Sequence, residues 1–256
     1  NGRDGSLLKS LVWGQGGYDS GPNRAFACVE GDKIIVGLDA GYSCTPRGIT
    51  AFSYATGETL WTYLVGPRIG KEMVCGGDVN HDGITEIAIG SFTPHNGASA
   101  NGTTDGDLYF ILNDENGNNL LTIMISTAWG SETDGFLYIA LADLNNDGTP
   151  EIIGFEGHNS HYPGTGRIHI VDPSSGTNLY TFEGPSPICY WDWSIVDIND
   201  DGIQEIVASA SEEKKIYVLS PTLALLDTST SGIGRVRAVN DVNGDGAKEI
   251  ILLGLS

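Results

Sequence analysis

The chain has 256 residues, of which 33 are acidic and 13 basic, and its formal net charge is −20. Such an acidic chain is a poor binder of nucleic acid or of an anionic membrane surface, and no apolar run approaches the roughly 20 residues of a membrane span. Hydrophobic residues at 40% argue against disorder, while 36 Gly residues and the lack of a 3.6-residue apolar period favour an all-β protein.

The first quarter of the chain predicts strands that no acidic loop interrupts. Segment 6–13 has the apolar character of a strand, and residues 25–29 and 33–37 predict a hairpin. Two further strands are expected at 49–54 and 59–64. The chain opens without an initiator Met or a signal peptide, which is typical of a processed or recombinant chain.

From residue 78 onward, the pattern D-x-N-x-D-G-x-x-E-I occurs four times. The copies begin at Asp78, Asp143, Asp197 and Asp241, and an apolar run follows each of them. Oxygen-bearing side chains at positions 1, 3 and 5 of a tight loop converge on one point, and the Gly at position 6 permits the turn. A hard cation is the natural guest, Ca²⁺ ahead of Mg²⁺. The last acid stands at position 9 rather than 12 and the flanks are β-type, so an EF-hand is rejected.

The repeat therefore predicts about four calcium sites, each with side-chain ligands at positions 1, 3, 5 and 9 and a backbone carbonyl at position 7. The expected ligands are Asp78, Asn80, Asp82, Ile84, Glu86, Asp143, Asn145, Asp147, Thr149, Glu151, Asp197, Asn199, Asp201, Ile203, Glu205, Asp241, Asn243, Asp245, Ala247 and Glu249. The alternative is four solvated acidic turns, which explains the composition but not the fixed Glu. Four bound ions would move the formal charge from −20 to −12.

The repeat resembles the FG-GAP/VCBS repeat of calcium-binding β-propellers, including those of integrin α subunits. The resemblance spans the chain and is sharpest in the four loops. It implies a propeller fold, metal loops between the first two strands of each blade, and an extracellular setting. It selects no ligand, because this fold carries both adhesion modules and enzymes such as polysaccharide lyases.

Between the loops, paired runs predict the remaining strands of four-stranded blades. These runs are 107–112 with 119–125, 167–171 with 179–182, and 215–219 with 223–226. We expect one domain of five blades, at about 24–70, 71–130, 135–187, 190–230, and 232–256 completed by the N-terminal strand of residues 1–13. The closing blade would then have three strands, or another copy of the chain would supply a fourth. Such strand exchange runs head-to-tail and can build a filament.

Binding and modification sites are expected on the rim opposite the metal loops, in long polar connections such as 91–106 and 155–166. Tyr190, Trp191 and Trp193 are candidates for stacking on sugar rings, with packing between blades as the alternative. Asn101 begins an N-glycosylation acceptor, Asn-Gly-Thr.

No nucleophile or phosphate-cradling motif is present, so no catalytic residue is assigned. A glycosidase pair would require the fold to bring together two of Asp105, Asp107, Glu132, Asp134, Glu156 and Asp192. Cys28, Cys44, Cys75 and Cys189 permit three disulfide pairings. We expect a secreted or cell-surface, calcium-stabilised structural or adhesion module, with no membrane insertion, whose partner is a glycan, a protein or another copy of itself. The alternatives are a lectin-like propeller and a polysaccharide lyase or hydrolase.

Overall fold

Antiparallel β-strands make up all of the regular secondary structure in the computed structural model, which describes residues 26–38, 47–94, 96–126, 135–158, 166–184, 191–210, 215–229 and 235–253. Segment 1–25 lies outside this range, and so does the predicted closing strand. No helix in the described residues is long and apolar enough to cross a membrane.

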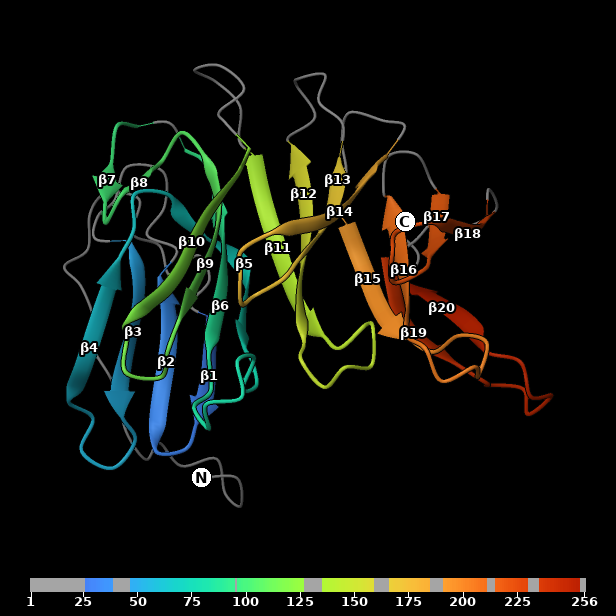
Figure 1. Cartoon of the computed structure of the whole chain (residues 1–256), viewed down its shortest axis with the longest axis horizontal. Helices are drawn as coiled ribbons and strands as arrows, with labels where there is room; N and C mark the ends of the chain where they lie inside the picture. Colours follow the sequence, from blue (N-terminus) through green and yellow to red (C-terminus); the bar gives the residue numbers. More distant parts are fainter. Residues whose placement is uncertain are drawn as a thin grey trace.

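The strands form five consecutive units, which Figure 1 shows side by side in chain order. Unit 1 is β1 (Phe26–Glu30), β2 (Lys33–Leu38), β3 (Gly48–Ser53) and β4 (Thr59–Leu64). Unit 2 is β5 (Arg68–Cys75), β6 (Ile87–Phe92), β9 (Leu108–Asn113) and β10 (Asn119–Ser126). Unit 3 is β11 (Gly135–Ala142), β12 (Glu151–His158), β13 (Arg167–Val171) and β14 (Asn178–Glu183).

Unit 4 is β15 (Trp191–Val196), β16 (Glu205–Ala210), β17 (Lys215–Leu219) and β18 (Leu225–Ser229), and unit 5 is the pair β19 (Arg235–Asn240) and β20 (Glu249–Leu253). The connection at 91–106 contains a short hairpin of β7 (Ser99–Ala100) and β8 (Thr103–Thr104), where the sequence suggested only a loop. Units 2 and 3 join into one larger sheet through the pairing of Phe136 with Phe92.

Burial follows strand position within a unit. The central strands β3, β9 and β16 are buried along their whole length, polar residues such as Thr50, Asn113 and Glu205 included. The outermost strands β4, β14 and β18 are mostly exposed. Tight turns join the last two strands. Gly117 has a φ of +84°, and a Cβ there would lie 2.6 Å from the Trp61 ring.

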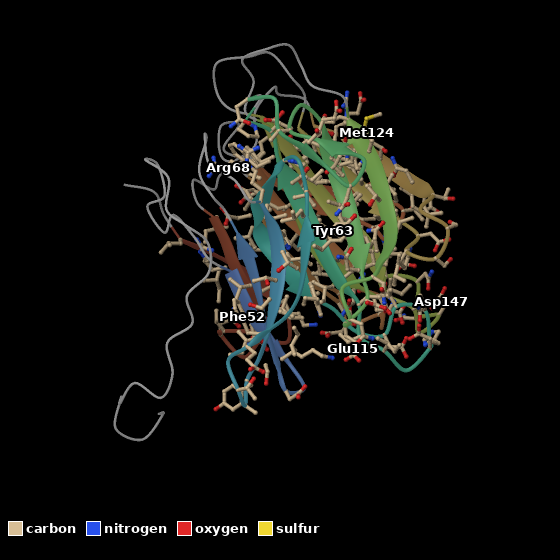
Figure 2. All side chains as sticks on the ribbon, turned by 90° about the vertical axis from the view of Figure 1, so that its left-hand side faces the viewer. Phe52, Tyr63, Arg68, Glu115, Met124 and Asp147 are labelled. Atoms are coloured by element: carbon tan, nitrogen blue, oxygen red, sulfur yellow. The ribbon has the colours of Figure 1, made fainter. Side chains whose placement is uncertain are left out.

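A hydrophobic core lies between each unit and the next. The clusters centre on Ile35, Ile49 and Ile89 (units 1 and 2), Phe110, Leu137 and Ile152 (units 2 and 3), Phe155, Ile206 and Tyr217 (units 3 and 4), and Val207, Val218 and Val236 (units 4 and 5). Units 1 and 5 lie at opposite ends of the longest axis (Figure 1), and Figure 2 looks onto the unit 1 end, where Phe52 and Tyr63 are labelled. The described chain is thus all-β and fits a β-propeller, while the predicted number of five blades stays a prediction.

Unit 5 is less covered than its counterparts. Val79 and Leu144, which follow the first Asp of their loops, are each 1% exposed, whereas the equivalent Val242 is 62% exposed. On β20, Ile251 is 39% and Leu253 is 55% exposed. In units 2 to 4 the corresponding strands are central and nearly fully buried. Among the described residues, β20 pairs only with β19.

Candidate metal-binding loops

The four acidic repeats all connect the first two strands of a unit, as the resemblance implied. They lie between β5 and β6, β11 and β12, β15 and β16, and β19 and β20, on the lower edge of the molecule in Figure 1. Antiparallel pairing brings the two ends of a loop together, since Glu151, Glu205 and Glu249 each pair with the residue that precedes the first Asp of their loop. One edge of the molecule therefore carries a row of four acidic loops.

Within each loop, side-chain oxygens turn inward to accept backbone N–H groups. In the first loop Asp78 accepts hydrogen bonds from the amides of Asp82 (3.0 Å) and Gly83 (2.8 Å), and Asn80 Oδ1 accepts one from Asp82 (2.9 Å). The Asp82 carboxylate accepts the amide of Ile84 at 2.8 Å. Gly83 has a φ of +84°, a conformation that favours glycine. The second and third loops repeat all of these contacts. The fourth repeats the others, but there the amide of Gly244, at position 4, donates to Asp241 Oδ1 at 2.6 Å.

The Glu at position 9 has a structural role that the spacing alone did not reveal. Glu86 Oε2 accepts the backbone N–H of Val79 (2.7 Å), and its Oε1 accepts a hydrogen bond from Asn80 Nδ2 (3.3 Å). The backbone contact recurs at Glu151, Glu205 and Glu249, each time at 2.9 Å. The Glu therefore ties the start of the loop to its end, and the short-range turn signals of Asp, Asn and Gly contain no hint of it.

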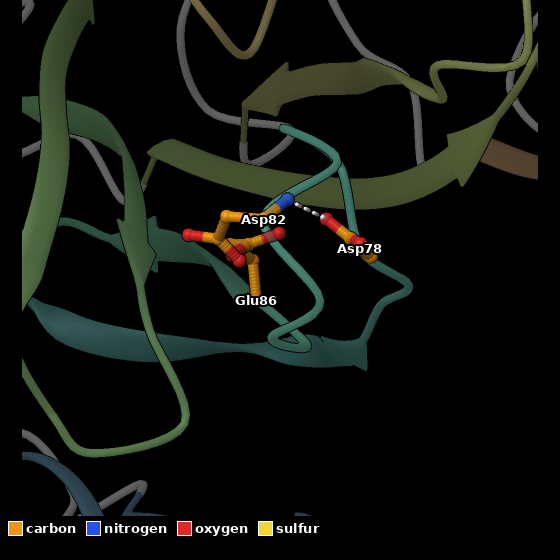
Figure 3. A group of neighbouring side chains, drawn as sticks. All are labelled: Asp78, Asp82 and Glu86. Carbon is orange, nitrogen blue, oxygen red and sulfur yellow. Dashed lines mark hydrogen bonds between the residues drawn. The ribbon is translucent and has the colours of Figure 1, made fainter.

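Three carboxylates of the first loop converge. Single oxygens of Asp78, Asp82 and Glu86 all lie within 4.8 Å of one another (Figure 3). Burial raises the pKa of Glu86, and the neighbouring charges of Asp82 and Asp78 raise it further. Burial acts in the same upward direction on Asp78, but hydrogen bonds from four backbone amides outweigh it and lower the pKa of that carboxyl.

The donor set of this loop fits a hard cation. It offers carboxylate and amide oxygens and neither sulfur nor imidazole, which is the chemistry that Ca²⁺ takes. Among the described residues, only the first loop brings three acidic groups this close. The amides of the position 7 residues Ile84, Thr149, Ile203 and Ala247 donate to the position 5 carboxylates at 2.8 Å. The role of their carbonyl oxygens as ligands stays a prediction.

Of the three residues predicted to stack on sugar rings, the structure describes the side chain of one, Trp193. Trp193 stacks on Phe155 with ring centroids 4.2 Å apart and planes 13° from parallel, within the core between units 3 and 4. This contact is packing between units, which the sequence left open as the alternative to stacking on sugar rings. Trp191 lies in β15, but its side chain is outside the described part of the structure, as is all of Tyr190.

The glycosylation acceptor lies in the turn between β7 and β8. Asn101 is exposed with a φ of +46°, and its Nδ2 donates to the Leu64 carbonyl of unit 1 at 3.0 Å. Thr103 is buried, and its hydroxyl donates to Ala100 O (2.7 Å) and accepts the Gly66 amide (2.9 Å). These residues join units 1 and 2, and glycosylation stays a prediction.

Each described carboxylate that was considered for a glycosidase pair contacts a basic or hydroxyl side chain. Arg47 pairs with Asp105, His169 with Glu156 (2.9 Å), Arg237 with Asp192 (3.5 Å), and Thr104 donates to Asp107 (2.8 Å). Glu132 and Asp134 lie outside the described residues, and so do Cys44, Cys189 and the side chains of Cys28 and Cys75.

Residues 78–154 match the family model of the FG-GAP-like repeat. This stretch holds the first two acidic loops and all of the unit 2 strands after β5, so the chain carries a repeat of this kind in units 2 and 3. No curated protein matches the chain.

Two solved structures are among those that match the chain. The exotype rhamnogalacturonan lyase YesX is 17% identical with a TM-score of 0.61, over 90% of this chain and 44% of that one. The V. cholerae biofilm matrix protein Bap1 is 18% identical with a TM-score of 0.39, over 81% of this chain and 37% of that one. The chain thus spans less than half the length of either structure. The likeness to the lyase shows a shared fold and no more.

Proposed function

We propose that this chain is a calcium-stabilised β-propeller that acts outside the cell as a non-enzymatic structural or adhesion module. The observation that carries the proposal is the convergence of Asp78, Asp82 and Glu86 in a loop whose hydrogen bond from the position 6 Gly to the position 1 Asp recurs in three more loops along one edge. Carboxylates held this close repel one another unless a cation lies between them.

The loops would hold the ion through the side chains at positions 1, 3, 5 and 9 and the carbonyl at position 7. Bound calcium would neutralise the converging carboxylates and fix the hairpin between the first two strands. Exposed loops of this kind suit the millimolar calcium found outside cells, which supports a secreted or cell-surface location. The chain's own residues then supply a rigid scaffold whose opposite rim is open to a glycan or protein ligand.

Calorimetric titration of metal-free protein tests the proposal. We expect binding of about four Ca²⁺ ions and a higher melting temperature, since a ligand at a hundredfold excess over Kd stabilises by about 2.7 kcal/mol per site. Mg²⁺ is the matched control and should bind more weakly. Absence of calcium binding would contradict the metal sites, and release of unsaturated sugars from rhamnogalacturonan would contradict the non-enzymatic role.

Self-association is a second candidate, which the uncovered face of unit 5 favours. Ile251 and Leu253 are exposed on β20, a strand that in other units is central and covered. A second copy could pair a strand with the edge of β20 and pack its own apolar side chains against Ile251 and Leu253. Light scattering should then show assemblies for the chain and monomers for Leu253→Lys. Leu226→Lys, on the exposed outer strand of unit 4, is the control that should still assemble. A chain that is monomeric at all concentrations would overturn this candidate.

A further inference from the structure

Successive acidic loops are in direct contact with one another. His81 Nε2 and Thr149 Oγ1 are 3.0 Å apart and join the first loop to the second. Asn146 Nδ2 donates to the carbonyl of Gly202 at 2.9 Å and joins the second loop to the third. Lys248 Nζ of the fourth loop donates to Asp200 Oδ1 and to the Asp197 carbonyl of the third. The row of loops is therefore continuous.

At all three junctions the earlier loop contributes its position 4 residue. His81, Asn146 and Asp200 each occupy this position, between the predicted ligands at positions 3 and 5. Each has a left-handed backbone, with φ of 60°, 58° and 61°. This conformation is uncommon for residues with a side chain, and Asn, Asp and His adopt it more readily than the others. The fourth loop has Gly244 there, with φ of 81°, and no further copy of the repeat follows it in this sequence.

The contacts reach the part of the next loop that holds its predicted ligands. Thr149 is itself at position 7, and its amide donates to the Asp147 carboxylate at 2.8 Å. Gly202 is at position 6, and its amide donates to the Asp197 carboxylate at 2.8 Å. A side chain that fixes either residue therefore also fixes a turn whose amides orient the acidic groups.

We propose that the position 4 side chains act as positioning residues between loops, so that an ordered loop raises the calcium affinity of its neighbour. The inference rests on the proposed calcium binding and extends it from four separate sites to one coupled row. Each of the three loops that touch a following loop has, at position 4, a polar side chain that tolerates this backbone and reaches the next loop.

Site-specific titration by NMR tests the coupling, because each loop has its own reporter. The amides of Gly83, Gly148, Gly202 and Gly246 donate to the position 1 Asp of their own loops at 2.8 to 3.0 Å, so calcium should shift each resonance separately. Asn146→Gly removes only the side chain and leaves a residue suited to positive φ. We expect the Gly202 midpoint to move to about threefold higher calcium, the effect of losing one hydrogen bond.

A second pair of variants separates positioning from folding. Thr149→Val removes the hydroxyl that His81 contacts, and Thr149→Ser keeps it. The Gly83 midpoint should move about threefold in the first variant and stay at its wild-type value in the second. Gly244→Asn, at position 4 of the fourth loop, should leave the Gly202 midpoint unchanged. Because the contact is exposed, Thr149→Val should lower the melting temperature of metal-free protein only slightly. A merely structural role would lower that temperature and leave the Gly83 midpoint unchanged.

The outcomes separate the two proposals. If no glycine amide responds to calcium, the metal sites fail and the coupling fails with them. If all four respond but Asn146→Gly leaves the Gly202 midpoint unchanged, calcium binding stands and the coupling is overturned.

Discussion

Arg47 and Asp105 form a buried ion pair between units 1 and 2, with 3.4 Å between Nη1 and Oδ2 and side chains that are 0% and 5% exposed. The same guanidinium nitrogen donates to the Gly66 carbonyl at 2.8 Å. Asp105 also accepts the backbone amides of Asn96 (2.7 Å) and Gly97 (3.2 Å). The pair therefore holds the β7–β8 hairpin against the end of β4.

Asp105→Ala should destabilise the protein by about 3 kcal/mol, because it removes a buried carboxylate that contacts the Arg47 charge and accepts two backbone amides. Urea unfolding of metal-free protein measures the change. Asp32→Ala, an exposed carboxylate in the β1–β2 turn, is the control and should stay within about 0.5 kcal/mol of the wild type. Equal losses in the free energy of unfolding for the two substitutions would contradict a stabilising role of the ion pair.

The free energy of unfolding of metal-free protein should depend on pH through two sets of loop carboxylates that act in opposite directions. Burial raises the pKa values of Glu86 and Glu151, so the folded state binds those protons more tightly than the unfolded state does. Their contribution is therefore greatest below the ordinary value of 4.5 and is lost as the pH rises through the raised pKa.

The position 1 carboxylates of the first, third and fourth loops behave in the opposite sense. Backbone amides lower the pKa values of Asp78, Asp197 and Asp241, so stability from these groups is lost as the pH falls below 3.8. Denaturant unfolding in EDTA should show a falling free energy of unfolding above pH 4.5, and Glu86→Gln should flatten that fall. A slope unchanged by Glu86→Gln would contradict this assignment.

Gly154 determines how closely unit 3 packs on unit 2. A Cβ at this position would lie 2.1 Å from Phe110 Cζ, in the core between the two units. Gly154→Ala should therefore destabilise by about 1 to 3 kcal/mol, and Phe110→Leu in the same chain should restore part of the loss. Gly77→Ala, where a Cβ meets nothing within 4 Å, is the thermal-unfolding control and should be nearly neutral.

Trp193 should matter for packing between units 3 and 4. Trp193→Ala removes the ring stacked on Phe155 and should cost about 3 kcal/mol, while Trp193→Phe keeps an aromatic ring and should cost much less. Chemical denaturation gives both values. If Trp193→Ala were neutral for stability but abolished glycan binding, the ligand-stacking role would be supported instead.

Periodic features of the sequence predicted most of the fold. The strands at 167–171 and 215–219 match β13 and β17, and all four loops lie between the first two strands of a unit. The prediction of a strand at 223–226 was wrong at Leu223, where the strand was expected to begin. This residue has a φ of +60° and its amide donates to Ser220 O, so β18 starts two residues later, at Leu225. Leu rarely adopts that conformation, and only the surrounding packing imposes it.

The loop chemistry was partly readable. The spacing located the acids, because each loop closes on itself within nine residues. It could not show the contacts of His81, Asn146 and Lys248, since these cross to loops 48 to 68 residues away. Nor could it pair Arg47 with Asp105, which are 58 residues apart. Long-range polar contacts depend on how the units stack, and no local pattern encodes that.

Because each hydrophobic core lies between consecutive units, the molecule behaves as a nearly one-dimensional array in which each unit is stabilised by its neighbours. Units 2 and 3 are held on both sides and share a sheet, whereas the described contacts of unit 5 are with unit 4 alone. Opening should therefore begin at β19 and β20 and move inward. Hydrogen exchange would then be fastest in unit 5 and slowest in β6, β9 and β12, so the molecule would unravel from one end rather than all at once.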